Sequence, residues 1–138
     1  MLLARREHTT AEARRKLGDQ GYEPDVVEQV LADYTERQLL DDARYASHYI
    51  ASRAGRGQGP VRIRLELREL GVAEPLIEQA LREGPDFKAN CRTLRERRFG
   101  NEPPQDWAEK SKQLRFLQYR GFSLDHIRSA LGPDIELE

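Results

Sequence analysis

The side chains that most often perform catalysis or bind metals are few and scattered in this sequence. Its histidines, His8, His48 and His126, stand far apart, and no two have the spacing of metal ligands. We expect all of them at the surface or at helix caps. The single cysteine, Cys91, can form neither an intramolecular disulfide nor a cysteine pair for zinc, and we expect a buried, neutral thiol. We therefore predict no enzyme, no cofactor and no metal site.

The glycine-rich segment Gly55-Arg56-Gly57-Gln58-Gly59 is the only part of the sequence that resembles a phosphate-binding loop. It lacks the Lys-Ser/Thr pair of such loops, and Pro60 follows it directly. We interpret it as a flexible hinge between two helices.

Basic residues give a stronger signal, because the net charge of −1 conceals separate charged blocks. Acidic residues dominate 19–42, whereas basic residues dominate 53–68, 88–98 and 110–120. Aromatic residues interrupt the last block, which suits a phosphate backbone with rings that stack on bases. The alternative is a solvated basic face whose aromatic rings pack inward. The candidate contact residues are Arg53, Arg56, Arg64, Arg68, Arg97, Arg98, Lys110, Lys112, Arg115, Tyr119 and Arg120.

The elements that must position these residues repeat along the chain. Gly21, Gly71 and Gly121 are 50 residues apart, and each is followed by an apolar residue. A leucine stands four residues before each glycine and another ten residues after it. We expect all six leucines to be buried, because each pair brackets the same helix–turn–helix. Such a repeat indicates an array of similar helical units.

Helix signals recur without any sustained period-2 alternation, so the predicted fold class is all-α. We expect three tandem three-helix units in an elongated array, the first lacking most of its first helix. The predicted units are 1–38, 39–84 and 85–132, with an acidic tail at 133–138. We predict Trp107 on one helix face with Leu114 and Leu117, and Val61 and Leu65 against a neighbouring unit. The helix starts are predicted at Thr9, Pro24, Asp41 or Asp42, Pro60, Pro75, Asp86 and Ser123.

No apolar run approaches the roughly 20 residues that a membrane helix needs. The first residues have too short an apolar part, and charges on the wrong side, for a signal peptide. We therefore expect a cytoplasmic protein without membrane contact, and a monomer.

Four segments resemble, in the right order, the motifs of one family. They are REHTTAEARRKL at 6–17, LDDARYA at 40–46, GQGPVRIRLEL at 57–67, and RFG at 98–100 followed by KSKQLRFLQYRGF at 110–122. The family is RecX, and the resemblance covers nearly the whole chain.

The resemblance implies a small all-α protein of three tandem three-helix units. RecX proteins bind the RecA recombinase, lie in the groove of its DNA filament and inhibit its ATPase, coprotease and strand-exchange activities without catalysing a reaction. The implied partners are RecA and the RecA–DNA filament, with weak direct binding to DNA. We hypothesise that the basic blocks meet DNA or acidic protein, and that 19–42 meets basic loops of RecA.

The main alternative is a DNA-binding module of tandem helix-turn-helix units that acts as a transcription factor. Its recognition helices should carry polar residues that read bases. The corresponding segments, 25–28 and 75–78, are instead acidic and apolar, which argues against insertion into the major groove. A tetratricopeptide-like scaffold would need a period near 34 residues, whereas the period here is 50.

Overall fold

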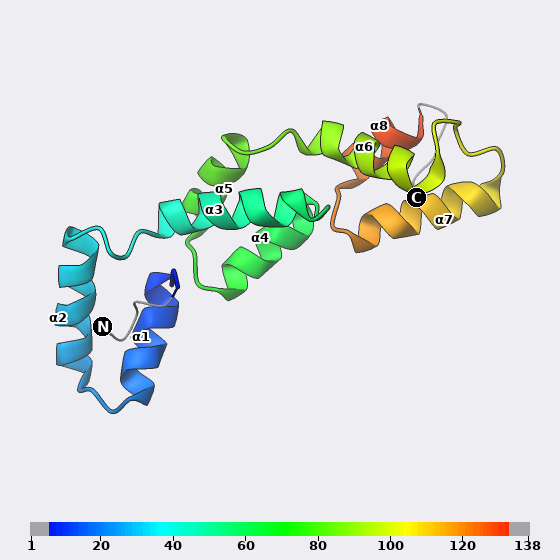
Figure 1. Ribbon diagram of the computed structural model, residues 1–138. Coiled ribbons are helices and arrows are strands. Elements are labelled where there is room, and N and C mark those ends of the chain that lie inside the picture. The colour runs from blue at the N-terminus through cyan, green and yellow to red at the C-terminus, as the bar shows by residue number, and fades with distance from the viewer. Residues whose placement is uncertain (1–5, 133–138) are drawn as a thin grey trace. The chain divides into compact units, whose positions relative to one another are not determined.

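The computed structural model describes residues 6–132, in which the secondary structure is entirely helical (Figure 1). The predicted acidic tail and the first five residues lie outside this range, whereas the all-α prediction is confirmed. None of the helices within 6–132 is long and apolar enough to cross a membrane. The helices are α1 Thr10–Asp19, α2 Pro24–Glu36, α3 Asp42–Gly55, α4 Pro60–Glu69, α5 Glu74–Arg82, α6 Phe87–Phe99, α7 Trp107–Tyr119 and α8 Leu124–Leu131.

Side-chain caps fix the starts of several helices. The hydroxyl of Thr9 accepts from the Glu12 amide, and the Glu12 carboxylate accepts from the Thr9 amide, so the two residues form a capping box. Helices α6, α7 and α8 are capped by Asp86, Asp106 and Ser123 respectively. One side-chain oxygen of each cap accepts a hydrogen bond from the backbone amide three residues later. Pro24 opens α2, where its missing N–H costs nothing. The starts at Thr9, Pro24, Asp86 and Ser123 confirm predicted ones, whereas the cap at Asp106 was not predicted. Helix α5 begins at Glu74, one residue before the predicted Pro75.

The same turn follows α1, α4 and α7. Its glycine has a φ of +93° at Gly21, +88° at Gly71 and +95° at Gly121. The amide after each glycine donates to the carbonyl of the leucine five residues earlier, which is the Schellman arrangement. These hydrogen bonds run from Tyr22 to Leu17 at 3.3 Å, from Val72 to Leu67 at 3.1 Å and from Phe122 to Leu117 at 3.2 Å. The 50-residue period therefore reflects one turn used three times.

The repeated leucines are buried with one exception. Leu17, Leu67 and Leu117 are at most 3% exposed, and Leu31 and Leu131 are also 3% exposed. Leu81 is only half-buried, so the expectation for this residue is wrong. Helix α5 ends one residue later, and the exposed segment 82–84 leaves one side of Leu81 uncovered.

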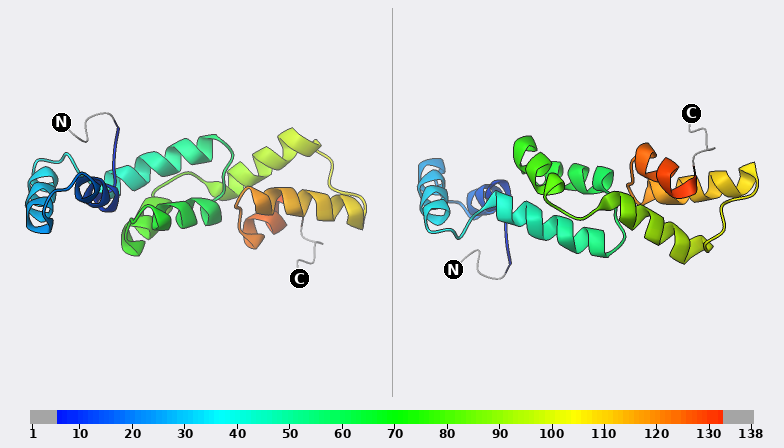
Figure 2. Two further views of the ribbon diagram at one scale, coloured as in Figure 1. Left: turned by 90° about the horizontal axis from the view of Figure 1, so that it is seen from below. Right: turned by 90° about the horizontal axis from the view of Figure 1, so that it is seen from above.

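The chain forms two compact units, and the division between them crosses α3 and α4. Within the described residues, unit 1 comprises 6–49 and Glu66–Glu83, and unit 2 comprises Ile50–Leu65 and 84–132. In unit 1, α1 packs on α2 around Ala13, Leu17, Val27, Leu31 and Leu40. In unit 2, α6 and α7 both pack on α8, as the two views of Figure 2 show. The predicted boundaries of the three-helix units stay a prediction.

Within each unit, the start of one helix lies against a repeated turn. In unit 1 the Thr9 hydroxyl donates to the Leu70 carbonyl at 2.6 Å, and a Cβ on Gly71 would overlap the Cβ of Ala11. In unit 2 the Gly59 amide donates to the Arg120 carbonyl at 2.8 Å. Gly59 is buried by this contact. The segment 55–59 joins α3 to α4 as predicted and is packed at Gly59, whereas its flexibility stays a prediction.

Candidate nucleic-acid and partner interface

Three of the predicted arginines line one hollow of unit 2. Arg56 follows α3, Arg97 lies on α6 and Arg120 follows α7, and together they border an open hollow of about 340 Å³. Its other lining residues are Ala54, Gly55, Gly57, Asn90, Thr93 and Leu94. The hollow thus combines guanidinium, amide and hydroxyl donors, which are the groups that bind phosphate oxygens.

Arg120 is held in place by its neighbours. Its Nη1 atom donates to the carbonyl of Arg56 at 3.2 Å, and its guanidinium lies 5.4 Å from the ring centre of Phe116. Gly57 has a φ of +85°, and a Cβ there would come within 3.4 Å of Arg120 Nη1. That distance is an ordinary contact, so the left-handed backbone, and not the neighbouring guanidinium, favours glycine at this position.

Cations and aromatic rings alternate where α6 meets α7. The guanidinium of Arg98 lies 5.2 Å from the ring centre of Phe116, and the ammonium of Lys112 lies 5.9 Å from that of Phe99. Phe99 and Phe116 meet edge to face with their centres 5.4 Å apart. Both rings are half-buried, as expected if aromatic residues of the basic block pack inward. Tyr119 differs, because it is 80% exposed.

The other predicted residues lie outside these two groups. Arg115 is exposed on α7 and Lys110 is half-buried there, whereas Arg53 and Arg64 are half-buried in unit 2 and each interacts with another part of the protein. Arg68 belongs to unit 1, where its guanidinium forms an ion pair with Glu74 at 3.3 Å. The structure therefore brings together Arg56, Arg97, Arg98, Lys112 and Arg120 from the predicted set.

One basic residue has a role that the sequence analysis missed. Arg95 is 4% exposed, and its Nε donates to Oε1 of Gln113, itself 2% exposed, at 3.0 Å. Arg95 also donates to the carbonyl of Glu102, and Gln113 donates to the carboxylate of Glu109 at 3.1 Å. This network ties the loop between α6 and α7 to both helices. Its signal in the sequence was the position of Arg95 at the helical spacing of buried Phe87 and Cys91.

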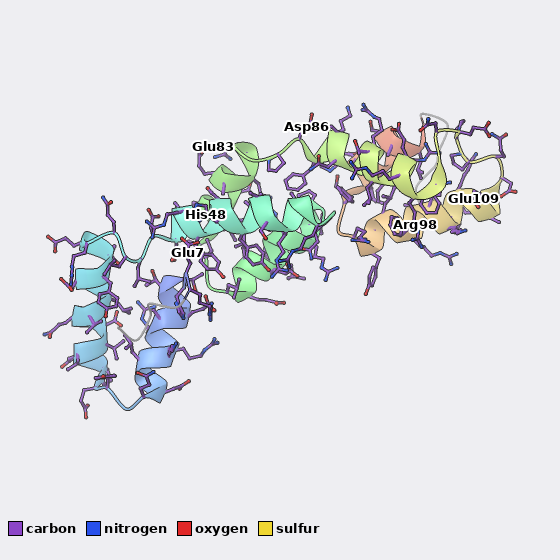
Figure 3. All side chains as sticks on the ribbon, in the orientation of Figure 1. Glu7, His48, Glu83, Asp86, Arg98 and Glu109 are labelled. Carbon is purple, nitrogen blue, oxygen red and sulfur yellow. The ribbon has the colours of Figure 1, made fainter. Side chains whose placement is uncertain are left out.

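The histidines occupy three different environments. His48 is exposed as expected, and its Nδ1 lies 3.0 Å from the Glu7 carboxylate. Figure 3 labels both residues. This hydrogen bond is the main reason why the pKa of Glu7 is lowered. His8 is 6% exposed and directly precedes Thr9, the N-cap of α1, so of the two predicted positions it has the one beside a helix cap and not the one at the surface. Burial is the main cause of the lowered pKa of both His8 and the half-buried His126.

No group of histidine, cysteine and carboxylate side chains within residues 6–132 could hold a metal ion. Cys91 is fully buried, and burial raises the pKa of its thiol to about 12. The expectation of a buried, neutral thiol is confirmed.

Family models match three successive segments of this helical chain. They describe the first, second and third three-helix domains of RecX, and they match residues 1–33, 41–81 and 86–131 respectively. This chain belongs to the RecX family. The family resemblance and the all-α architecture of three-helix domains that the sequence predicted are thus confirmed.

Curated RecX proteins cover most of the chain. It is 48% identical over 130 residues to the regulatory protein RecX of Halorhodospira halophila (strain DSM 244 / SL1), covering 94% of this chain and 81% of that relative. It is 44% identical over 137 residues to regulatory protein RecX of Pseudomonas fluorescens, covering 98% and 88%. The relatives are named as regulatory proteins, so the chain is a member of a family of regulators.

Solved RecX structures share the fold. The crystal structure of RecX from Lactobacillus salivarius matches with a TM-score of 0.81 at 23% identity, covering 93% of this chain and 86% of that one. A second crystal structure, of regulatory protein RecX, matches with a TM-score of 0.76 at 27% identity, covering 93% and 65%.

Proposed function

We propose that this RecX-family protein binds the RecA recombinase and its DNA filament and inhibits the ATPase, coprotease and strand-exchange activities of RecA. The observation that carries the proposal is the match of all three RecX domains in order along the chain. The regulator performs no catalysis in this proposal, and it acts by occupying the filament as a cytoplasmic monomer.

The arginine hollow of unit 2 supports contact with DNA inside the filament. Arg56 and Arg97 are exposed, whereas Arg120 is fixed by Phe116 and the Arg56 carbonyl. A guanidinium presents paired N–H donors that match phosphate oxygens, and a fixed guanidinium loses less entropy when it binds. We therefore assign a phosphate-contacting role to this hollow.

The direct test is ATP hydrolysis by RecA on single-stranded DNA with increasing amounts of the protein. We expect hydrolysis to slow at equimolar or lower ratios, because a bound regulator would limit the active filament. Unchanged hydrolysis with an excess of folded protein would overturn the proposal. Repeating the assay with a form extended at its N-terminus would show whether further residues are needed.

A pair of double variants tests the role of the hollow. Arg56→Ala with Arg97→Ala removes two charges from it, and Arg92→Ala with Arg128→Ala removes two charges from exposed positions of unit 2 that do not line it. The logarithm of the binding constant for single-stranded DNA falls linearly with the logarithm of the salt concentration. Each lost phosphate contact should reduce the magnitude of this slope by roughly 0.7, so the loss of two contacts should reduce it by about 1.4. Equal slopes for both variants would show that the hollow makes no phosphate contact.

The same experiments address the alternative of a transcription factor. A protein that binds a particular duplex sequence and leaves RecA hydrolysis unchanged would support that alternative. The exposed residues Asp25, Glu28 and Glu74 at the starts of α2 and α5 favour the filament regulator, because carboxylates there would face DNA phosphates.

A further inference from the structure

The large exposed side chains of unit 2 include two aromatic rings on α7. Tyr119, at the last position of the helix, is 80% exposed, and Trp107, at its first position, is 69% exposed. On α4, Val61 and Leu65 are 55% and 51% exposed, so the expectation that they pack against a neighbouring unit is wrong. The surroundings of Tyr119 point to a ligand.

The repeated fold does not require an aromatic ring at position 119. A shift by 50 residues aligns Tyr119 with Asp19 and Glu69, which are also exposed and also occupy the last position of a helix. Helices α1 and α4 therefore end in the same turn with a carboxylate at this position. The ring of Tyr119 thus contributes little to the fold, and a substitution there should leave the turn intact.

Two basic residues share the exposed side of α7 with Tyr119. At 100° per residue, Lys112, Arg115 and Tyr119 fall within about 60° of one another around the helix. All three side chains are exposed. The acidic residue of α7, Glu109, lies in the first turn, at the other end of the helix from Tyr119, and its carboxylate accepts from the side-chain amide of Gln113 at 3.1 Å. The side of α7 that carries Tyr119 is therefore basic.

Contacts near the end of α7 add positive charge beside Tyr119. Phe116 precedes Tyr119 by three residues, so the two side chains are neighbours on the helix surface. The guanidinium groups of Arg98 and Arg120 lie 5.2 Å and 5.4 Å from the centre of the Phe116 ring. Arg120 also borders the arginine hollow, so the basic side of α7 adjoins the proposed phosphate contact.

We infer that the ring of Tyr119 stacks on an unpaired base while Lys112 and Arg115 contact phosphates of the same strand. The inference rests on the part of the proposed function that concerns DNA, and it names the form of that DNA as a single strand. Proteins that bind single strands combine a basic surface, which follows the backbone, with aromatic rings on which bases stack. In a duplex the bases are stacked on one another, so the ring has no free base to cover. This side of α7 should therefore favour single-stranded over duplex DNA.

Trp107 provides a matched control, because it is an exposed ring on the same helix. It follows the N-cap Asp106 and precedes Glu109, so its surroundings are acidic and repel phosphate. We compare Tyr119→Ala with Trp107→Ala, and Tyr119→Phe keeps the ring without its hydroxyl group. Both native side chains are largely exposed, so all three variants should fold, which far-UV circular dichroism and urea unfolding verify.

Fluorescence anisotropy measures binding to a labelled oligothymidylate, to an abasic strand of the same length and to a duplex of the same length. Tyr119→Ala should bind oligothymidylate about fivefold more weakly or worse, which is the factor expected for the loss of one stacked base. Its affinity for the abasic strand and the duplex, and the salt dependence of its binding, should equal those of the parent, because the substitution removes no charge. Tyr119→Phe and Trp107→Ala should match the parent on every probe.

Several results would overturn the inference. Equal binding of oligothymidylate by the parent and Tyr119→Ala would show that the ring makes no contact, and equal losses from Tyr119→Ala and Trp107→Ala would show that the basic surroundings select nothing. A matching loss on the abasic strand would show that the ring acts without a base. A parent that binds no probe, or that binds the duplex as tightly as the single strand, would also contradict the inference.

ATP hydrolysis by RecA separates this inference from the proposed function. If the parent slows hydrolysis and Tyr119→Ala binds oligothymidylate as the parent does, the inference alone fails. If single strands bind through Tyr119 but hydrolysis is unchanged by an excess of the parent, the proposed inhibition of RecA alone fails.

Discussion

Replacing Gly71 by alanine should destabilise the protein much more than the same change at Gly21. Both glycines have a left-handed φ, +88° and +93°, so both substitutions incur the same backbone penalty. Their surroundings differ, because a Cβ at position 71 would overlap the Cβ of Ala11, whereas nothing lies within 4 Å of a Cβ at position 21. The comparison therefore separates backbone conformation from packing.

The expected magnitudes follow from these two contributions. The left-handed conformation costs an alanine about 1–2 kcal/mol, and the lower entropy of the unfolded chain offsets about 0.4–1 kcal/mol. Gly21→Ala should thus cost about 1 kcal/mol. The overlap with Ala11 adds the cost of overpacking, about 1–3 kcal/mol, so Gly71→Ala should cost about 2–4 kcal/mol.

Urea unfolding followed by far-UV circular dichroism measures both changes in the free energy of unfolding. Combining Gly71→Ala with Ala11→Gly completes a double-mutant cycle, because it removes the Cβ that the new methyl group meets. The cycle should return most of the packing cost and none of the backbone cost. Equal destabilisation by Gly21→Ala and Gly71→Ala, or a cycle without coupling, would refute the close approach of α1 to this turn.

Two further predictions concern titratable groups. Because burial raises the pKa of the Cys91 thiol to about 12, this cysteine should react with a thiol reagent only after unfolding, and rapid modification of the native protein would contradict its burial. The pKa values of His8 and His126 are lower in the folded state than in the unfolded state. As the pH decreases through about 6.5, the unfolded state therefore binds more protons than the folded state, and the free energy of unfolding should fall. Urea unfolding across this range should show a flatter pH dependence when both histidines are changed to glutamine, and an unchanged slope would contradict their burial.

The sequence predicted the local features of the fold well, because these depend on neighbouring residues. The repeated glycines, the capping box at Thr9 and the cap at Asp86 each act within one or two helical turns. Trp107 shows the limit of such reasoning. Its helical spacing placed it on one face with Leu117, yet Leu117 is fully buried and Trp107 is 69% exposed. Trp107 occupies the first position of α7, beyond the buried residues Gln113 and Leu117.

The sequence predicted the candidate site less completely, because the arginine hollow depends on long-range packing. Arg56, Arg97 and Arg120 meet only because the turn before α4 packs on the turn after α7, through residues about 60 positions apart such as Gly59 and Arg120. A helical wheel contains no information on that contact. Composition also cannot distinguish Arg95, which is buried against Gln113, from the exposed basic residues near it on α6.

The division through α3 and α4 has a consequence for dissecting this protein into pieces. Each compact unit is assembled from two separate stretches of chain, with the changes of unit at Tyr49/Ile50, Leu65/Glu66 and Glu83/Gly84. No single cleavage can therefore release an intact unit, and a gene fragment that encodes only the matched second domain, 41–81, would supply an incomplete part of both. A truncation that isolates the second domain would therefore divide both units, so point substitutions at exposed positions are the appropriate tools for mapping function on that part of the chain.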